Sequence, residues 1–182
     1  MNTTSNAQPV LMYRLREPRV ATAIRKAIIL LHGVGSNEND LFALADQLPD
    51  DLYVVAARRP FTLGPGRYAW YNVDFSSGRP VYDAGQEATS RARIAQFSAE
   101  MKQIHHLDTV YVGGFSQGAI MSYGIGLIQP QIVQGVVVLS GRLLEEIKPL
   151  VADATMLAKL NVFIAHGTQD NVLAIDYARS AK

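Results

Sequence analysis

The sequence predicts an α/β fold with a mostly parallel central sheet and helices on both faces. The first observation is that short apolar runs alternate along the chain with longer amphipathic stretches. The second is that several of these runs lack polar alternation, which is typical of strands buried on both faces. The third is a globular composition, with 48% hydrophobic and 18% charged residues. A length of 182 residues predicts a single domain spanning residues 1–182.

Six apolar runs are the expected strands. The first alternates apolar and polar residues with a period of two and therefore predicts an edge-type strand. The second and third are continuously apolar, as buried strands are. In chain order, the six runs are 10–16, 26–33, 51–60, 108–116, 132–141 and 161–167.

Helical spacing of apolar residues predicts the connecting helices. The clearest case is 84–104, where Ile94, Phe97, Met101 and Ile104 recur every three or four residues. Segment 60–83 is rich in glycine and proline and predicts a long loop that carries an aromatic cluster. Long loops of this kind tend to be functional. The other expected helices are 39–49, 117–129, 143–151 and 172–181.

The charge balance and cysteine content exclude several classes of function. With 17 basic and 16 acidic residues, nothing indicates a nucleic-acid partner or a charged membrane surface. The chain has no cysteine, so it can form no disulfide and no thiolate metal site. Apolar runs such as 27–31 are far too short to span a membrane. Residues 1–9 lack the pattern of a signal peptide, so we expect a cytoplasmic protein.

Residues 114–118 read Gly-Phe-Ser-Gln-Gly and match the pattern G-x-S-x-G. Roughly one in twenty random chains of this composition would match it by chance. The context strengthens the match, because it follows an expected strand and opens an expected helix, as in a nucleophile elbow. The alternative is a glycine-rich turn with an incidental serine. We favour Ser116 as a nucleophile.

The chemistry explains the residue types in this turn. A tight turn from strand to helix leaves no room for side chains at Gly114 and Gly118, while Ser116 projects above the sheet. The helix N-terminus favours negative charge. The Gln117 backbone N–H can therefore donate one hydrogen bond to a developing oxyanion.

A second oxyanion donor is expected in residues 31–35, Leu-His-Gly-Val-Gly, after the first buried strand. Glycine lets this backbone approach closely, and we assign the donor to the Val34 N–H. His32 could be a catalytic base, but it would reach Ser116 from the oxyanion side. A general base acts from the other side, so we interpret His32 as structural.

Asp170 follows the last expected strand and is the candidate acid. In folds with this elbow the chain order is serine, acid, histidine, and the acid orients the imidazole. The alternative is that Asp170 caps the helix that follows it. His166, at the strand end, is interpreted as structural.

These motifs together resemble the phospholipase/carboxylesterase family of α/β-hydrolases, which includes acyl-protein thioesterases. The matching segments are "LHGVGSNENDL" (31–41), "RYAWYNVD" (67–74), "VGGFSQGAIMSY" (112–123), "VVLSGRL" (137–143) and "AHGTQDNV" (165–172).

The resemblance implies a serine hydrolase that forms an acyl-enzyme on small carboxylic esters or thioesters, with no metal or organic cofactor. It implies Ser116 as nucleophile, Asp170 as acid, and Val34 and Gln117 as the oxyanion hole. It also suggests that Trp70 and Tyr71 line the acyl side of the site. Ordinary core packing explains this aromatic pair equally well.

The chain departs from the family pattern at its end. The family's catalytic histidine follows the acid after one more helix and strand, and this sequence has no histidine after Asp170. We expect a truncated chain whose unpaired strand edge and apolar surface would promote aggregation or a homodimer. The alternatives are an inactivated or non-catalytic hydrolase-fold protein that binds an acyl ligand or a protein partner, and recruitment of His166 as the base. The four histidines are His32, His105, His106 and His166.

Overall fold

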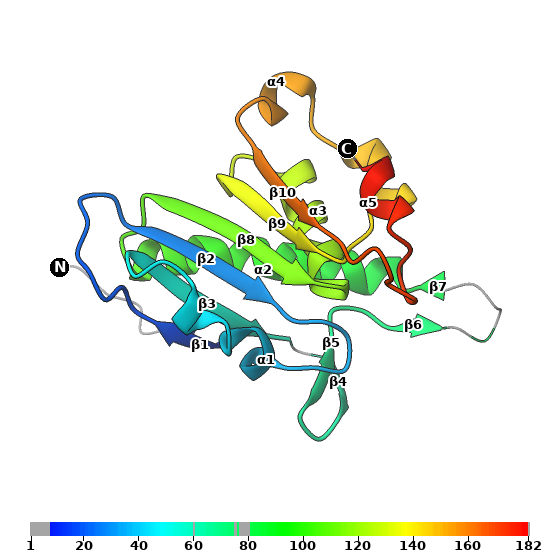
Figure 1. Cartoon of the computed structure of the whole chain (residues 1–182), viewed down its shortest axis with the longest axis horizontal. Helices are drawn as coiled ribbons and strands as arrows, with labels where there is room; N and C mark the ends of the chain where they lie inside the picture. The colour runs from blue at the N-terminus through cyan, green and yellow to red at the C-terminus, as the bar shows by residue number, and fades with distance from the viewer. Residues whose placement is uncertain (1–7, 60, 75, 77–80, 182) are drawn as a thin grey trace.

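The computed structural model describes residues 8–59, 61–74, 76 and 81–181, and a six-stranded sheet forms its centre (Figure 1). The strand order is β1-β3-β2-β8-β9-β10, with β1 antiparallel to β3 and every other pair parallel. The predicted α/β class, with its mostly parallel sheet, is therefore confirmed. The strands are β1 (Met12–Arg16), β2 (Lys26–Leu31), β3 (Leu52–Arg58), β8 (Thr109–Phe115), β9 (Gly135–Leu139) and β10 (Asn161–Ala165).

The register aligns the carboxyl ends of four neighbouring strands. Leu31 of β2 pairs with Gly114 of β8, and Gly114 pairs with Val138 of β9. Val138 in turn pairs with Ile164 of β10. Residues that follow these strands therefore emerge along one edge of the sheet, which is where open α/β sheets bind their ligands.

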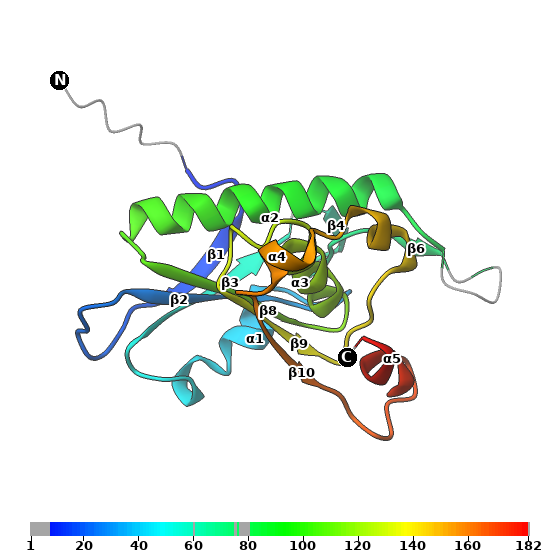
Figure 2. The ribbon, with the colours of Figure 1, turned by 90° about the horizontal axis from the view of Figure 1, so that it is seen from above.

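Helices cover both faces of the sheet (Figure 2). On one face, α2 (Ala84–Ile104) and α3 (Gln117–Ile128) bury the larger apolar cluster, which includes Ile94, Phe97 and Met101. On the other face, the short α1 (Glu38–Phe42) packs Leu41 against β2 and β3. The predicted helix 84–104 thus matches the observed α2. No helix in the described part of the chain is both long and apolar enough to cross a membrane.

The prediction of a structureless loop at 60–83 is wrong where the structure describes it. Two hairpins lie there, the first joining β4 (Phe61–Gly64) to β5 (Arg67–Ala69). The second joins β6 (Val73–Asp74) to β7 (Val81–Tyr82). Gly64 and Gly66 adopt φ values of 150° and 68°, so the glycines that indicated a loop instead form a tight hairpin turn. Residues 60, 75 and 77–80 lie outside the description.

Three predicted helices are shorter than expected. The segment 39–49 divides into α1 and the 3₁₀ helix Ala45–Gln47, and 143–151 forms a 3₁₀ helix, Glu145–Leu150, that contains Pro149. In place of a helix over 172–181, α5 spans only Asp176–Ser180. The sequence reading missed α4 (Ala154–Leu157), whose first turn is capped by the Asp153 carboxylate.

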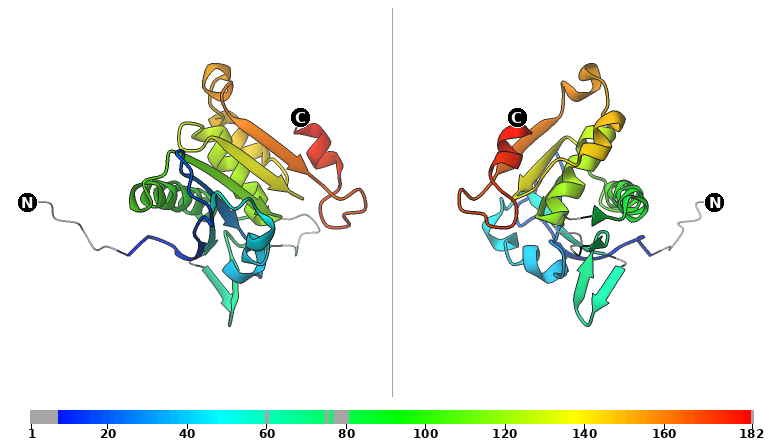
Figure 3. Two further views of the ribbon diagram at one scale, coloured as in Figure 1. Left: turned by 60° about the vertical axis from the view of Figure 1, so that its left-hand side comes forward. Right: turned by 90° about the vertical axis from the view of Figure 1, so that its right-hand side faces the viewer.

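Strand β10 lies at the margin of the sheet, and among the described residues only β9 pairs with it (Figure 3). Its side chains Val162 and Phe163 are 46% and 59% exposed, whereas Val112 at the centre of β8 is fully buried. This apolar edge matches the exposed edge that we expected. Its consequence for oligomeric state stays a prediction.

Candidate active site

Ser116 occupies a strained turn between β8 and α3. Its backbone has φ 53° and ψ −115°, in the positive-φ region that non-glycine residues rarely adopt. The Ser116 N–H donates to the Leu139 carbonyl at 2.9 Å, which ties the turn to the end of β9. The side chain is half-buried and does not cap α3. The hydroxyl is therefore presented at the edge of the sheet and is not used by the helix.

Close packing explains both glycines of the motif. A Cβ on Gly118 would lie 1.9 Å from the carbonyl oxygen of Leu31, and a Cβ on Gly114 would lie 2.4 Å from the Gly118 carbonyl carbon. These neighbours are backbone atoms, which cannot rotate away as a side chain can. The strand–turn–helix at Ser116 therefore requires glycine at both positions.

The segment after β2 lies against this turn. A Cβ on Gly33 would be 3.6 Å from the Ser116 Cβ. Gly35, at φ 76°, turns the chain and donates its N–H to the Tyr68 carbonyl at 2.7 Å. Within the described residues, neither the Val34 nor the Gln117 backbone N–H donates a hydrogen bond. Both predicted oxyanion donors are thus unengaged next to Ser116.

Trp70 and Tyr71 are buried, with exposed fractions of 0% and 2%. Their burial favours core packing, the second interpretation that the sequence allowed. The Gln117 side chain contacts both: its Oε1 accepts from the Trp70 N–H at 2.6 Å, and its Nε2 donates to the Tyr71 carbonyl at 2.7 Å. Sequence reasoning used only the Gln117 backbone and missed this contact, because the partners lie far apart in the chain.

His32 is a buried residue that supports the loop carrying Val34. Its Nδ1 lies 2.8 Å from the Gly33 carbonyl, and its ring centroid lies 5.5 Å from that of Trp70. Burial lowers the pKa of His32, so the ring is neutral at pH 7 and Nδ1–H donates to the carbonyl. This contact agrees with the structural interpretation of His32.

Asp170 does not cap α5, contrary to the alternative considered from sequence, because that helix begins at Asp176. Its Oδ1 instead accepts from the Val172 and Leu173 N–H groups, each at 2.9 Å. These two amides, that of Leu173 first, hold the pKa of Asp170 below its usual value, with smaller contributions from Ser140 and His166. The carboxylate is therefore ionised at neutral pH.

A series of hydrogen bonds relates Asp170 to Ser116. Ser116 is bonded to Leu139 at the end of β9, and the next residue, Ser140, donates its N–H to Ala165 of β10 at 2.9 Å. The Ser140 side chain in turn reaches the Asp170 carboxylate. Ser116 and Asp170 thus follow strands that are two positions apart in the sheet.

His166 lies beside the acid. Its Nε2 is 2.7 Å from the Leu173 carbonyl and 3.6 Å from Asp170 Oδ2, while its buried Nδ1 has no partner among the described residues. The structure records no hydrogen bond between any of the four histidines and Ser116 within its described part.

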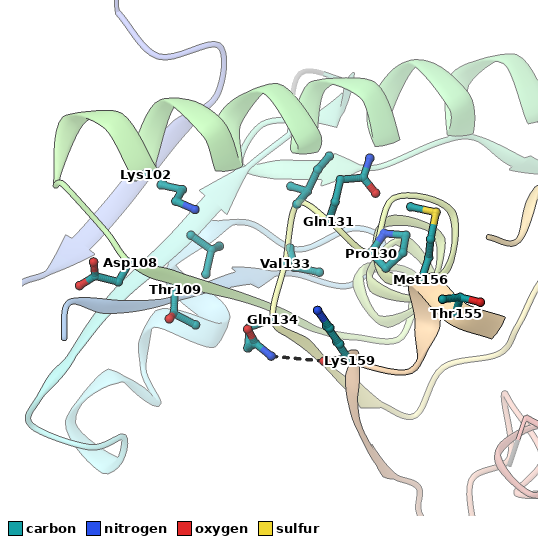
Figure 4. A pocket seen from close by; sticks show the side chains of 12 residues that line it. Lys102, Asp108, Thr109, Pro130, Gln131, Val133, Gln134, Thr155, Met156 and Lys159 are labelled. Carbon is teal, nitrogen blue, oxygen red and sulfur yellow. Dashed lines mark hydrogen bonds between the residues drawn. The ribbon is translucent and has the colours of Figure 1, made fainter. Parts of the chain in front are cut away.

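A hollow of about 350 Å³ lies at the opposite end of the sheet (Figure 4). Its lining includes Thr109, the first residue of β8, together with Lys102 and Lys159. It is thus separated from Ser116 by the length of β8, so we exclude it from the candidate active site.

The mostly parallel sheet and the strained serine in the turn between strand and helix are those of an α/β-hydrolase. The profile of the phospholipase/carboxylesterase family matches residues 18–182. The chain belongs to this family.

Individual relatives agree with this assignment. Acyl-protein thioesterase 1 of Yarrowia lipolytica is 25% identical over 167 residues, which cover 85% of this chain and 74% of the relative. Among solved structures, esterase PE8 is 26% identical with a TM-score of 0.75, and the match covers 94% of this chain and 81% of that one. The Bacillus cereus carboxylesterase shares the fold, with a TM-score of 0.77 at 22% identity, covering 97% of this chain and 78% of that one. Family and relatives together indicate a hydrolase of the esterase or thioesterase type.

Proposed function

We propose that the protein is a serine hydrolase that cleaves carboxylic esters or thioesters through an acyl-enzyme on Ser116. One observation supports this most directly: Ser116 has a strained backbone conformation, and in the described part of the chain neither the Val34 nor the Gln117 N–H has a hydrogen-bond partner. In a turn with only a structural role, the strained backbone and the unpaired N–H groups would cost stability without any benefit.

In the proposed reaction, an imidazole base removes the Ser116 proton and the hydroxyl oxygen attacks the acyl carbonyl carbon. The carbonyl oxygen becomes an oxyanion that accepts hydrogen bonds from the Val34 and Gln117 N–H groups. Collapse of this intermediate expels the alcohol or thiol, which takes the proton from the imidazolium. A water molecule then releases the acid by the same steps and restores the serine.

Asp170 is proposed to orient the imidazole and to stabilise its cation. Ser116 follows β8 and Asp170 follows β10, two strands whose carboxyl ends lie at the same edge of the sheet. We assign the roles of nucleophile and acid to residues of this chain and assign no histidine to the base.

Labelling with a fluorophosphonate probe tests the nucleophile. We expect covalent labelling of the wild-type chain at Ser116 and none of Ser116→Ala. Free imidazole in the buffer should accelerate labelling of the wild type, because the small molecule can act as the general base that removes the Ser116 proton. Labelling that persists in Ser116→Ala would contradict the proposal.

Asp170→Asn tests the acid. Because an amide cannot stabilise the imidazolium, imidazole-dependent ester hydrolysis should fall on the order of 10³–10⁴-fold. Asp176→Asn is the matched control, since that carboxylate is exposed and bonds only Arg179. Equal rates for Asp170→Asn and the control would assign the acid elsewhere.

A non-catalytic hydrolase-fold protein that binds an acyl ligand is the second candidate, favoured by the absence of a recorded contact between Ser116 and a histidine in the described residues. Saturable binding of a fatty acid to a wild type that the probe never labels would support it.

A further inference from the structure

Trp70 is a buried residue whose three polar groups each bond a different part of the molecule. Its backbone N–H donates to Gln117 Oε1 at 2.6 Å, and its indole Nε1–H donates to the His32 carbonyl at 2.9 Å. Its carbonyl accepts from Ser90 Oγ of α2 at 2.7 Å. Trp70 is fully buried, so each bond that is lost leaves a polar group with neither a partner nor water.

Two of these bonds lead to the segments that carry the oxyanion donors. Gln117 bonds Trp70 through its side chain and carries one donor on its own backbone. His32 lies two residues before Val34, which carries the other donor. Trp70 therefore connects the two donor segments through a rigid indole.

The chemistry of Gln117 suits this role. A carboxamide presents one acceptor and one donor side by side, and here they meet the N–H of Trp70 and the carbonyl of Tyr71. A carboxylate in the same place would set an oxygen against the Tyr71 carbonyl, and an aliphatic chain would leave both backbone groups unpaired. Gln117 is 3% exposed, so water cannot replace either bond.

The far side of Trp70 is also fixed. Arg59, which is 2% exposed, donates through Nη2 to Ser90 Oγ. Its guanidinium carbon lies 5.2 Å from the Trp70 ring centroid and 4.6 Å from that of Phe61. The indole is thus held by stacking as well as by its hydrogen bonds.

We propose that the Gln117 side chain and Trp70 are positioning residues that set the distance and direction of the two oxyanion donors. This inference rests on the proposed function of Ser116. Neither side chain needs to touch the substrate, because each acts through the backbone of its neighbours. Displacement of such a donor by about 1 Å costs on the order of 10–100-fold in rate.

The test compares the second-order rate constant of fluorophosphonate labelling in Gln117→Met, Trp70→Phe and Ser122→Ala. Gln117→Met keeps the length of the side chain and loses both hydrogen bonds. Trp70→Phe loses the indole N–H and part of the ring, but keeps the backbone groups that bond Gln117 and Ser90. Ser122→Ala is the control, since it removes another buried bond of α3, to the Gly118 carbonyl, without reaching Trp70. We expect rates lower by about 10–100-fold in Gln117→Met, by about tenfold in Trp70→Phe, and unchanged in Ser122→Ala.

A second measurement does not depend on activity. Trp70 is the only tryptophan in the chain, so its indole N–H gives a single NMR resonance. The hydrogen exchange of this proton should be slow in the wild type and in Ser122→Ala, and faster in Gln117→Met.

Unchanged labelling in Gln117→Met would overturn the inference while leaving Ser116 as the nucleophile. Equal losses of rate in Gln117→Met and Ser122→Ala would also overturn it, since a general loss of packing would then explain both. Failure of the proposed function is distinguishable, because the wild type would then show no labelling at all, or labelling would persist in Ser116→Ala.

Discussion

The two halves of the candidate site are held in different ways. Around Ser116, backbone atoms from β2, β8 and α3 pack so closely that glycine is required at Gly114 and Gly118. Around Asp170, the carboxylate is held by its own neighbours in sequence, the amides of Val172 and Leu173. The position of Ser116 therefore depends on contacts between distant parts of the chain, whereas that of Asp170 depends on a local turn.

Burial follows the same division. Strand β8 is buried along most of its length, while β10 exposes Val162 and Phe163 at the margin of the sheet. We therefore expect the two parts of the proposed site, around Ser116 and around Asp170, to differ greatly in their tolerance to substitution. Matched substitutions in the two halves measure this difference directly.

Gly118→Ala and Gly167→Ala give the largest expected contrast. The new methyl group at 118 would lie 1.9 Å from the Leu31 carbonyl oxygen. We therefore expect the free energy of unfolding to fall by more than about 4 kcal/mol, or the protein not to fold. A methyl group at 167 would lie 3.9 Å from its nearest neighbours, two atoms of Asp170. The free energy of unfolding of Gly167→Ala should therefore differ from that of the wild type by less than about 0.5 kcal/mol. Urea denaturation and the yield of folded protein measure both. Similar stability of the two variants would contradict the division.

Val112→Ala and Val162→Ala test the same contrast for side chains. Val112 is fully buried in β8, so the loss of two methyl groups and the resulting cavity should cost about 2 kcal/mol. Val162 is 46% exposed in β10, and its truncation should change the free energy of unfolding by less than about 0.5 kcal/mol. A large loss at Val162 would show that the β10 edge is covered in solution, and its dependence on protein concentration would reveal a homodimer.

The pH dependence of stability gives the smallest effect. Burial lowers the pKa of His32 in the folded state, so the unfolded chain binds more protons just below the usual histidine pKa of about 6.5. The free energy of unfolding should therefore fall as the pH drops below about 6.5, by at most about 1.4 kcal/mol per pH unit. His32→Asn keeps a donor for the Gly33 carbonyl and should flatten this slope. Identical slopes in the two proteins would contradict the role of His32.

The sequence predicted those features that depend on local pattern. Apolar runs that alternate along the chain with amphipathic segments indicated the parallel sheet. The glycines around Ser116 indicated a tight turn between strand and helix, which the structure contains. The bond between Gln117 and Trp70 could not be predicted, because it joins residues that only the folded sheet brings together. The hairpin at Phe61–Ala69 was missed because glycine and proline indicate a change of direction without saying whether the flanking residues pair.

The backbone conformation of Ser116 also limits which nucleophile an engineer could install there. At φ 53° an unbranched side chain is tolerated, but a second heavy atom on Cβ meets the adjacent backbone. Cysteine fits the same stereochemistry and would convert the site to thiol chemistry. Threonine carries the same hydroxyl as serine, yet its extra methyl group makes it unsuitable at this position. Only residues that are unbranched at Cβ can therefore serve as nucleophiles at this turn, whatever their reactivity.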